Sequence, residues 1–283
     1  MPRPVISTSA PMKCAVVGHP VAHSLSPALH RAAYRQLGLD WSYEAVDVEP
    51  GGLARFVGGL DRGRWRGLSV TMPHKPDLVA LGAPDELVRL TGVANTLVLD
   101  AAGDTVHNTD VPGFVRSCEA HGLARASRVV IVGNGATAAS VLVAVARMGA
   151  RSVVVLAREP RRGEHLVGLA GGLGVACEVR RLGDPVGSCD LVASTVPAAA
   201  LGPHAAALAA GAGVVFDAVY DPWPTPLATA GRNAGRVVVN GLDLLAGQAV
   251  DQVRLMTGGL VSFELLRSAG EAALRARGET LRD

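Results

Sequence analysis

The stretch RVVIVGNGATA, residues 128–138, decides the fold. Arg128–Val132 is almost entirely apolar and predicts a buried strand. The next residues, Gly133-Asn134-Gly135-Ala136-Thr137-Ala138, form a turn with the spacing G-x-G-x-x-A, and a helix is predicted from about Thr137 to Met148, where Gly149 ends it. A strand, a glycine turn and a helix in this order are the context in which such a turn binds a dinucleotide.

Each small residue of this turn has a physical role in such a site. Gly133 permits the tight turn, Gly135 lets the backbone approach a pyrophosphate, and Ala138 allows the helix to pack closely on the strand. The free N–H groups at the start of the helix, around Ala136 and Thr137, favour a phosphate. The simpler alternative is a glycine turn that binds nothing.

The end of the next predicted strand, at residues 152–156, indicates which dinucleotide is bound. An NAD site usually has an acidic residue there, but this chain has Ala157 and Arg158, followed by Arg161 and Arg162. Because a guanidinium suits a 2′-phosphate, the sequence favours NADP(H) as cofactor. Glu159 would oppose this if its side chain pointed inward.

Apolar runs and amphipathic segments alternate along the whole chain, which predicts an α/β fold. Strands are expected at residues 14–18, 42–48, 68–72, 96–99, 128–132, 152–156, 190–193, 214–218 and 236–239. Helices are expected at 26–37, 51–60, 113–121, 137–148, between the strands at 190–193 and 214–218, from 242 to beyond 255, and at 263–276. We therefore expect a substrate-binding catalytic domain at residues 1–112 and a Rossmann-type domain at 113–241. The C-terminal helices, residues 242–283, are expected to pack back onto the first domain.

Composition excludes several other classes of protein. The chain has 283 residues, with 27 basic and 25 acidic residues, so its net charge of +2 gives no reason to expect nucleic acid or a membrane as partner. The first dozen residues lack the apolar run of a signal peptide. The four cysteines show no zinc-like spacing and are expected to be buried free thiols in a cytoplasmic protein, with no metal. A monomer and a homodimer are both compatible with the sequence.

Four polar clusters in the first half end strands or form turns. They are His23-Ser24-Leu25-Ser26-Pro27, Ser69-Val70-Thr71-Met72-Pro73-His74-Lys75, Ala94-Asn95-Thr96 and Asn108-Thr109-Asp110. Strand ends are where open α/β sheets bind ligands. Hydroxyls, amides, one lysine and one carboxylate are suited to a small polyhydroxylated acid.

With these clusters, the glycine turn and a late G-L-x-x-L-x-x-Q motif, the chain resembles the shikimate dehydrogenase family from about residue 13 to 275. The resemblance implies two α/β domains around a cleft and the reversible reduction of 3-dehydroshikimate to shikimate by NADPH, a step toward chorismate and the aromatic amino acids. It implies that Lys75 and Asp110 are the catalytic pair. Substrate contacts are implied for Ser24, Ser26, Thr71, Lys75, Asn95, Asp110, Tyr220 and Gln248. Cofactor contacts are implied for the Gly133–Ala138 turn, Arg158, Arg162, Thr195, Val219 and Gly241.

The sequence departs from the family at several places. The family often has Asn at the position of Ser69, N-R-T where this chain has Ala157-Arg158-Glu159, and N-A-T where it has Ala193-Ser194-Thr195. An enzyme of the same family acting on quinate, and a metabolite sensor without activity, are the alternative functions.

Lys75 is supported independently of the resemblance. The chain contains only two lysines, Lys13 and Lys75, among its 27 basic residues. A basic surface position without a functional need for lysine would therefore be expected to carry arginine. Arginine stays protonated and cannot easily donate a proton. The alternatives are a solvated surface lysine at 75, a turn-forming Asp110, and serines at 24 and 26 that only cap a helix.

Some polar residues near the clusters have simpler readings. His19, His23, His74 and His107 show no carboxylate partner by spacing, so packing roles are expected for them. Gln248 could equally be exposed to solvent, and Tyr220 and Trp223 could belong to the core or to a lid.

Overall fold

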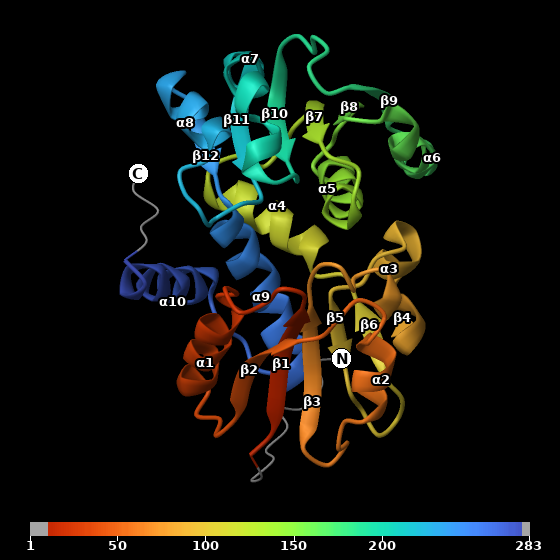
Figure 1. Ribbon diagram of the computed structural model, residues 1–283, viewed down its shortest axis with the longest axis vertical. Helices are drawn as coiled ribbons and strands as arrows, with labels where there is room; N and C mark the ends of the chain where they lie inside the picture. Colours follow the sequence, from red (N-terminus) through yellow and green to blue (C-terminus); the bar gives the residue numbers. More distant parts are fainter. Residues whose placement is uncertain (1–10, 279–283) are drawn as a thin grey trace. The chain divides into compact units, whose positions relative to one another are not determined.

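The computed structural model describes residues 11–278, so residues 1–10 and residues 279–283, the end of the expected C-terminal helical segment, lie outside the described part. The chain folds as two compact units (Figure 1). Within the described residues, the first unit comprises residues 11–109 and 245–277, and the second comprises residues 110–244 and 278. Each unit has its own β-sheet, so the predicted α/β fold with two sheets is confirmed. The substrate and cofactor roles of the two halves stay predictions.

The sheet of the first unit is mixed. Its six strands lie in the order β2-β1-β3-β5-β6-β4. They are β1 (Lys13–Gly18), β2 (Ser42–Asp47), β3 (Trp65–Val70), β4 (Ala83–Pro84), β5 (Thr96–Val98) and β6 (Thr105–His107). The strand β1 is parallel to β2 and β3, whereas β5 is antiparallel to both β3 and β6. The carboxyl end of β3 therefore lies beside the start of β5.

The side chains of β3 point alternately to the two faces of this sheet, and this distinguishes an apolar face from a polar one. Leu68 and Val70 belong to an apolar cluster with residues of α2 (Leu53–Gly58) and the 3-10 helix η1 (Asp77–Leu81). Because successive strand residues point to opposite faces, Ser69 points to the other face. This is the face that carries the polar groups described below.

Three further helices belong to this unit. They are α1 (Ser26–Gln36), α9 (Gly241–Thr257), of which the residues from Leu245 onward belong to the first unit, and α10 (Phe263–Ala276). A Cβ atom on Gly67 would lie 3.0 Å from Cγ of Met256 and 2.6 Å from the Leu97 carbonyl oxygen, so glycine is needed where α9 approaches the sheet. The C-terminal helix α10 packs against α1.

The sheet of the second unit is parallel and Rossmann-like. Its six strands lie in the order β12-β11-β10-β7-β8-β9. They are β7 (Arg128–Val132), β8 (Ser152–Ala157), β9 (Ala176–Arg181), β10 (Cys189–Ser194), β11 (Ala212–Asp217) and β12 (Val237–Val239). All recorded pairings in this sheet are parallel, as the continuous apolar runs predict.

Helices cover both faces of the second sheet. Val215 packs with Leu208 of α7 (Ala205–Gly211) on one face. The next residue, Phe216, contacts Phe114 of α4 (Asp110–Ala120) with the ring centroids 4.8 Å apart, so α4 lies on the other face. The helix after the glycine turn, α5 (Ala136–Arg147), packs beside α4.

Several predicted boundaries are wrong. The strand expected at residues 68–72 is Trp65–Val70, because the chain turns at Thr71, where the carbonyl accepts a hydrogen bond from the His74 N–H. The helix expected at 113–121 begins already at Asp110, since Pro112 falls in its first turn, where proline is tolerated.

Besides four 3-10 helices, six short strands and α-helices within residues 11–278 were not predicted. They are α3 (Glu86–Thr91), α6 (Glu164–Gly172), α8 (Pro226–Asn233), β4, β6 and β9. The sequence did contain a helix-start signal for two of these helices, because Asp85 and Thr225 are N-cap residues whose side chains cap α3 and α8. The strand β9 lies at a sheet edge and is only partly buried, so it lacks an apolar run. Among the described helices, none has the length and apolar character needed to cross a membrane.

Candidate active site

The predicted glycine turn lies between β7 and α5. Gly133 has a φ of +114°, and a Cβ atom there would lie 2.3 Å from Oγ1 of Thr195, so the fold itself requires glycine. Gly135 differs, because its φ of −90° suits any residue and a Cβ atom would meet nothing within 4 Å. The turn thus leaves open space beside Gly135, and this space fits the close approach of a dinucleotide pyrophosphate to the backbone.

The other residues of the turn follow the same arrangement. Ala136 and Thr137 begin α5, after Asn134 and Gly135, and Ala138 is fully buried against the rest of the unit. The N-cap residue of this helix is Gly135, which has no side chain to accept from the N–H groups of the first turn. These N–H groups are therefore suited to a phosphate.

The arginines at the end of β8 are not equivalent. The Arg162 Nε lies 3.2 Å from a carboxylate oxygen of Glu159, and both side chains are exposed. Glu159 is therefore directed toward Arg162. Arg158 makes no ion pair or side-chain hydrogen bond among residues 11–278, and it directly follows the last residue of β8. Arg161 is likewise unpaired within residues 11–278, so the contacts set Arg162 apart from Arg158 and Arg161, and of these two Arg158 lies nearer to the end of β8.

Three further predicted cofactor residues lie at the carboxyl ends of strands in this unit. The Oγ1 of Thr195 donates to the Val132 carbonyl at 2.9 Å, which ties the loop after β10 to the glycine turn. The Val219 N–H donates to Asp217, and the Val219 carbonyl accepts from Gly241 at 3.3 Å. The parallel sheet thus brings the carboxyl ends of β7, β10, β11 and β12 to the same side of the sheet. Open α/β sheets bind their ligands at this side.

Asp217 is a buried carboxyl that the sequence did not single out. It is fully buried, and burial raises its pKa to about 6 against an opposing effect of its hydrogen bond with the Thr225 hydroxyl. The Thr225 Oγ1 donates to Asp217 at 2.7 Å, and Thr225 also caps α8. Asp217 therefore holds the loop that carries Val219 and Tyr220.

In the first unit, Ser24 and Ser26 lie at the start of α1. Ser24 Oγ accepts from the Ser26 N–H at 3.3 Å, but the N-cap residue is Leu25, which provides no side-chain cap. Ser26 is buried and Ser24 is half-buried. The capping alternative thus applies to one amide only. Pro27 has no N–H, and the Ala28 N–H donates to the Leu25 carbonyl at 2.9 Å, so the serine hydroxyls are the groups of this segment suited to an anion.

The Thr71 and Lys75 motif is tied to the Asn95 motif through the backbone. The Thr71 N–H donates to the Val17 carbonyl at 2.8 Å, and the Lys75 carbonyl accepts from the Ala94 N–H at 3.2 Å. Ala94 immediately precedes Asn95, so Lys75 and Asn95 start from neighbouring backbone positions. The Lys75 side chain is half-buried and has a further interaction within the chain.

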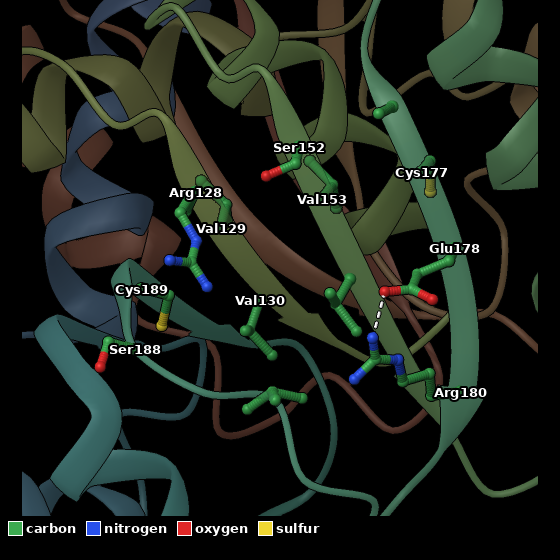
Figure 2. A pocket seen from close by; sticks show the side chains of 13 residues that line it. Arg128, Val129, Val130, Ser152, Val153, Cys177, Glu178, Arg180, Ser188 and Cys189 are labelled. Atoms are coloured by element: carbon green, nitrogen blue, oxygen red, sulfur yellow. Dashed lines mark hydrogen bonds and ion pairs between the residues drawn. The ribbon is translucent and has the colours of Figure 1, made fainter.

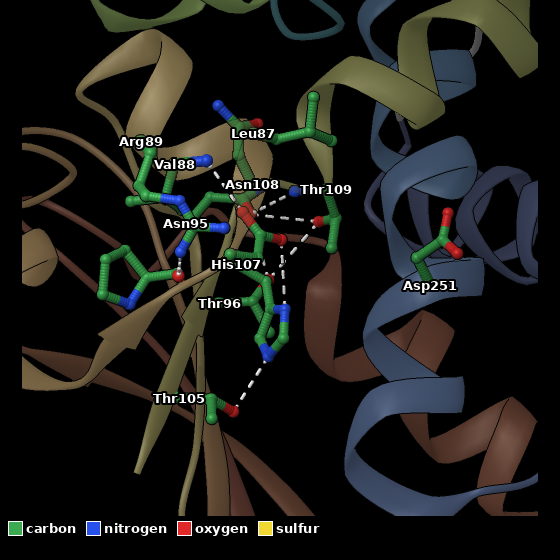
Figure 3. Close-up of polar contacts among 12 residues, drawn as sticks. Leu87, Val88, Arg89, Asn95, Thr96, Thr105, His107, Asn108, Thr109 and Asp251 are labelled. Atoms are coloured by element: carbon green, nitrogen blue, oxygen red, sulfur yellow. Dashed lines mark hydrogen bonds and ion pairs between the residues drawn. The ribbon is translucent and has the colours of Figure 1, made fainter. Parts of the chain in front are cut away.

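Asn95 and Gln248, which are 153 positions apart in the sequence, are hydrogen-bonded. Asn95 Nδ2 donates to Gln248 Oε1 at 2.8 Å, while Asn95 Oδ1 accepts from the Thr109 backbone N–H at 2.8 Å. Figure 3 shows Asn95, Thr96 and Thr109 gathered in this region of the first unit. The solvent-exposed alternative for Gln248 is therefore wrong.

Asp110 and Tyr220 belong to the second unit. Asp110 follows Thr109 directly, begins α4 and is buried at 1% exposure. Tyr220 is half-buried in the loop after β11. Both residues make interactions within the chain. The proposed pairing of Asp110 with Lys75 stays a prediction.

Three of the four histidines have a carboxylate neighbour that the sequence analysis did not identify. His19 Nδ1 lies 2.6 Å from Asp47, His107 Nδ1 lies 3.1 Å from Asp85, and His74 Nδ1 lies 4.0 Å from Asp77. Two of these partners are more than 20 positions away along the chain, so spacing could not reveal them. Hydrogen bonding to Asp47 raises the pKa of His19.

The sequence also missed a buried polar network on the face of the first sheet that carries Ser69. The Tyr43 hydroxyl donates to Ser69 at 2.6 Å, and Ser69 donates to Gln252 at 3.0 Å. His30 stacks on Tyr43 with the ring centroids 4.0 Å apart. Burial lowers the pKa of His30 to about 4. The spacing of Gln252, one helical turn after Gln248, was the available signal.

The cysteine prediction is partly wrong. Cys14 and Cys118 are buried free thiols as expected, whereas Cys177 and Cys189 are free but only half-buried. Burial raises the pKa of Cys14 to about 12 and that of Cys189 to about 11, so both stay protonated thiols near neutral pH. Cys177 and Cys189 line a cavity of about 290 Å³ in the second unit (Figure 2).

This cavity is separate from the glycine turn. It contains Arg128, Ser152 and Cys189, the first residues of β7, β8 and β10, whereas Gly133 follows the last residue of β7. Cavity and turn therefore lie at opposite ends of the parallel strands.

The fold and these sites together define a class. A parallel Rossmann-like sheet with a glycine turn, joined to a unit whose strand ends gather amides, hydroxyls and a lysine, is typical of dinucleotide-dependent oxidoreductases of the α/β class.

Comparisons with known proteins identify the family. Residues 16–97 match the family model "Shikimate dehydrogenase substrate binding domain". The chain is 38% identical over 257 residues to Shikimate dehydrogenase (NADP(+)) of Moorella thermoacetica, covering 86% of this chain and 87% of that protein. The crystal structure of Mycobacterium tuberculosis shikimate dehydrogenase matches with a TM-score of 0.86 and 38% identity, covering 93% of this chain and 100% of the other. The chain belongs to the shikimate dehydrogenase family.

A structure of shikimate 5-dehydrogenase from Thermus thermophilus, in complex with NADP(H) and shikimate, is also similar. It has a TM-score of 0.79 and 29% identity, and the match covers 93% of this chain and 100% of the other.

Proposed function

We propose that this protein is an NADP-dependent shikimate dehydrogenase, which reversibly reduces the ketone of 3-dehydroshikimate to the alcohol of shikimate. The relatives that match most of the chain are named Shikimate dehydrogenase (NADP(+)). Within the structure, the observation that best supports the proposal is the hydrogen bond between Asn95 and Gln248. It joins two substrate motifs from opposite ends of the chain in the unit that contains Lys75.

In this proposal the second unit binds the cofactor. The open space beside Gly135 accepts the pyrophosphate, the start of α5 provides N–H donors, and Arg158 binds the 2′-phosphate. Thr195, Val219 and Gly241 line the same strand edge. NADPH, when bound, supplies the hydride that reduces the ketone carbon.

The remaining chemistry is assigned to side chains of the chain. The Lys75 ammonium donates a proton to the substrate oxygen on which negative charge develops, and its positive charge stabilises that oxygen. The Asp110 carboxylate holds this ammonium and accepts a hydrogen bond from the neighbouring hydroxyl. Ser24, Ser26 and Tyr220 bind the substrate carboxylate, while Thr71, Asn95 and Gln248 bind ring hydroxyls. The cytoplasmic location and the monomeric or homodimeric state belong to the same proposal.

The test is a set of initial rates for oxidation of shikimate and quinate, each with NADP and NAD, for the wild type and Lys75→Ala. We expect fastest turnover of shikimate with NADP and a loss of about a thousandfold or more in kcat for Lys75→Ala, because a proton donor and its charge are both removed. NADP affinity, measured by fluorescence titration, should not change in the variant.

Other results would replace the proposal. A preference for quinate with NAD would keep the family and change both substrate and cofactor. Binding of shikimate without turnover of either acid would indicate a sensor.

A further inference from the structure

The side chain of Gln252 lies between the sheet of the first unit and the proposed substrate residue Gln248. Ser69 of β3 and Thr96 of β5 are directly paired across the sheet, so their side chains point to the same face. Gln252 lies over this pair and is only 2% exposed. A carboxamide buried to this degree needs a partner for each of its donors and acceptors.

The direction of each hydrogen bond in this network follows from one backbone group. The Thr109 N–H can only donate, so the atom of Asn95 that faces it at 2.8 Å must be the oxygen Oδ1. The Asn95 nitrogen therefore faces Gln248 and requires an oxygen there, which is Oε1 at 2.8 Å. This assignment does not depend on placing hydrogens on a side chain.

The same reasoning assigns the oxygen and the nitrogen of the Gln252 carboxamide. Its group 3.4 Å from Gln248 Oε1 must be the donor Nε2, because two amide oxygens would repel each other. Its other end, Oε1, then accepts from Ser69 Oγ at 3.0 Å and from His30 Nε2 at 3.2 Å. His30 supplies that proton as a neutral imidazole, since its burial disfavours the charged form.

We infer that Gln252 is a positioning residue for substrate binding, which holds the Gln248 carboxamide so that its NH2 group, not its oxygen, is presented to a substrate hydroxyl. Gln248 Oε1 accepts from Asn95 and Gln252, whereas Gln248 Nε2 makes no hydrogen bond within the described part of the chain. The inference rests on the proposed function, in which Gln248 contacts a ring hydroxyl. It also gives Ser69 a role, since the Ser69 hydroxyl anchors Gln252 rather than facing a ligand.

The variant Gln252→Glu tests the inference with almost no change of shape. A carboxylate keeps the acceptor for Ser69 and His30 but has no hydrogen to donate to Gln248. We expect the KM for shikimate to rise about tenfold, the KM for NADP to stay within about twofold, and kcat to change less than the KM, because a contact made in ground and transition state alike is lost.

The pH dependence separates positioning from a general structural effect. When the new carboxyl group is protonated it regains one O–H donor, and burial favours its protonated form. The ratio of the variant's shikimate KM to that of the wild type should therefore fall toward 1 as pH decreases. Gln252→Met, which cannot donate at any pH, should show a raised ratio without this recovery.

Ser117→Ala serves as the matched control. It removes one buried side-chain hydrogen bond, from Ser117 Oγ to the Gly113 carbonyl at 2.7 Å, in the second unit. We expect a lower melting temperature with an unchanged shikimate KM.

The possible outcomes are distinguishable. Active wild-type enzyme with an unchanged shikimate KM in Gln252→Glu at every pH overturns this inference alone. Equal increases in the KM values for shikimate and NADP overturn it as well, because they indicate general damage. A wild-type chain that does not oxidise shikimate overturns the proposed function and this inference with it.

Discussion

The candidate sites of the two units are built from different groups, side chains in the first unit and mostly backbone in the second. In the first unit, side chains such as Asn95, Gln248 and Gln252 orient one another through a buried network of neutral hydrogen bonds. In the second unit, the glycine turn and the strand ends present mostly backbone groups, and Asp217 is a buried carboxyl whose pKa is raised by burial. A site made of side chains depends on which partners fold against it, whereas a site made of backbone depends on conformations that a few glycines permit.

The largest expected effect comes from a matched pair of glycines. Gly133→Ala should lower the free energy of unfolding of the second unit by about 3–5 kcal/mol, because a positive φ and a close contact with Thr195 both oppose a side chain. Gly135→Ala should leave stability almost unchanged and raise the KM for NADP tenfold or more. Urea unfolding followed by Trp223 fluorescence, with Trp41 and Trp65 replaced by Phe, measures the first effect. An unchanged NADP KM in Gly135→Ala would show that the turn does not approach the cofactor.

The first unit should lose stability as pH falls from about 6.5 to about 4. Burial lowers the pKa of His30 from 6.5 to about 4, so the unfolded chain binds a proton at a pH where the folded chain does not. The stabilisation is complete above pH 6.5, and its loss corresponds to about 3 kcal/mol. Urea unfolding at several pH values, followed by Trp41 and Trp65 in a Trp223→Phe background, measures it. His30→Phe, which keeps an aromatic ring on Tyr43, should remove this part of the slope.

The second unit should show the opposite slope. Burial raises the pKa of Asp217 from 3.8 to about 6, so the stabilisation is complete below pH 3.8 and is lost as pH rises through about 6. The expected change is again about 3 kcal/mol. Asp217→Asn should abolish it, as followed by Trp223 fluorescence. If both units respond to pH in the same direction, the contrast between their buried groups does not control their stability.

Arg158→Ala should raise the KM for NADP by about 10- to 100-fold, because one charged hydrogen-bond donor to a phosphate is removed. The KM for NAD should not change, since NAD lacks the 2′-phosphate. Arg162→Ala is the control, and we expect less than a threefold change because Arg162 is paired with Glu159. A larger effect for Arg162 than for Arg158 would reverse the assignment.

The smallest effect is expected at the exposed pair of His19 and Asp47. Asp47 also accepts from the Val21 N–H at 3.2 Å, so it holds the segment that leads to Ser24. Asp47→Asn should lower the pKa of His19, measured by NMR titration, and raise the KM for shikimate only two- to threefold, because exposed ion pairs contribute little. A change of tenfold or more would make this pair part of the binding site.

The sequence alone determined the main strands and helices of the protein. The apolar run before Gly133 and the glycine spacing predicted the parallel sheet and the start of α5, because local backbone preferences and burial depend on nearby residues. The short elements β4, β6, β9, α3, α6 and α8 escaped prediction, since few of their residues are buried and their stability comes from neighbours.

The tertiary structure decided which polar groups meet. The partners of Asn95 and His19 are Gln248 and Asp47, which lie 153 and 28 positions away. No periodicity within one segment encodes such pairs, because they arise only when sheet and helices pack together. The sequence thus named Gln248 and Lys75 as candidates, and the packing of α9 onto β3 and β5 brought Gln252 into hydrogen bonds with Gln248 and Ser69.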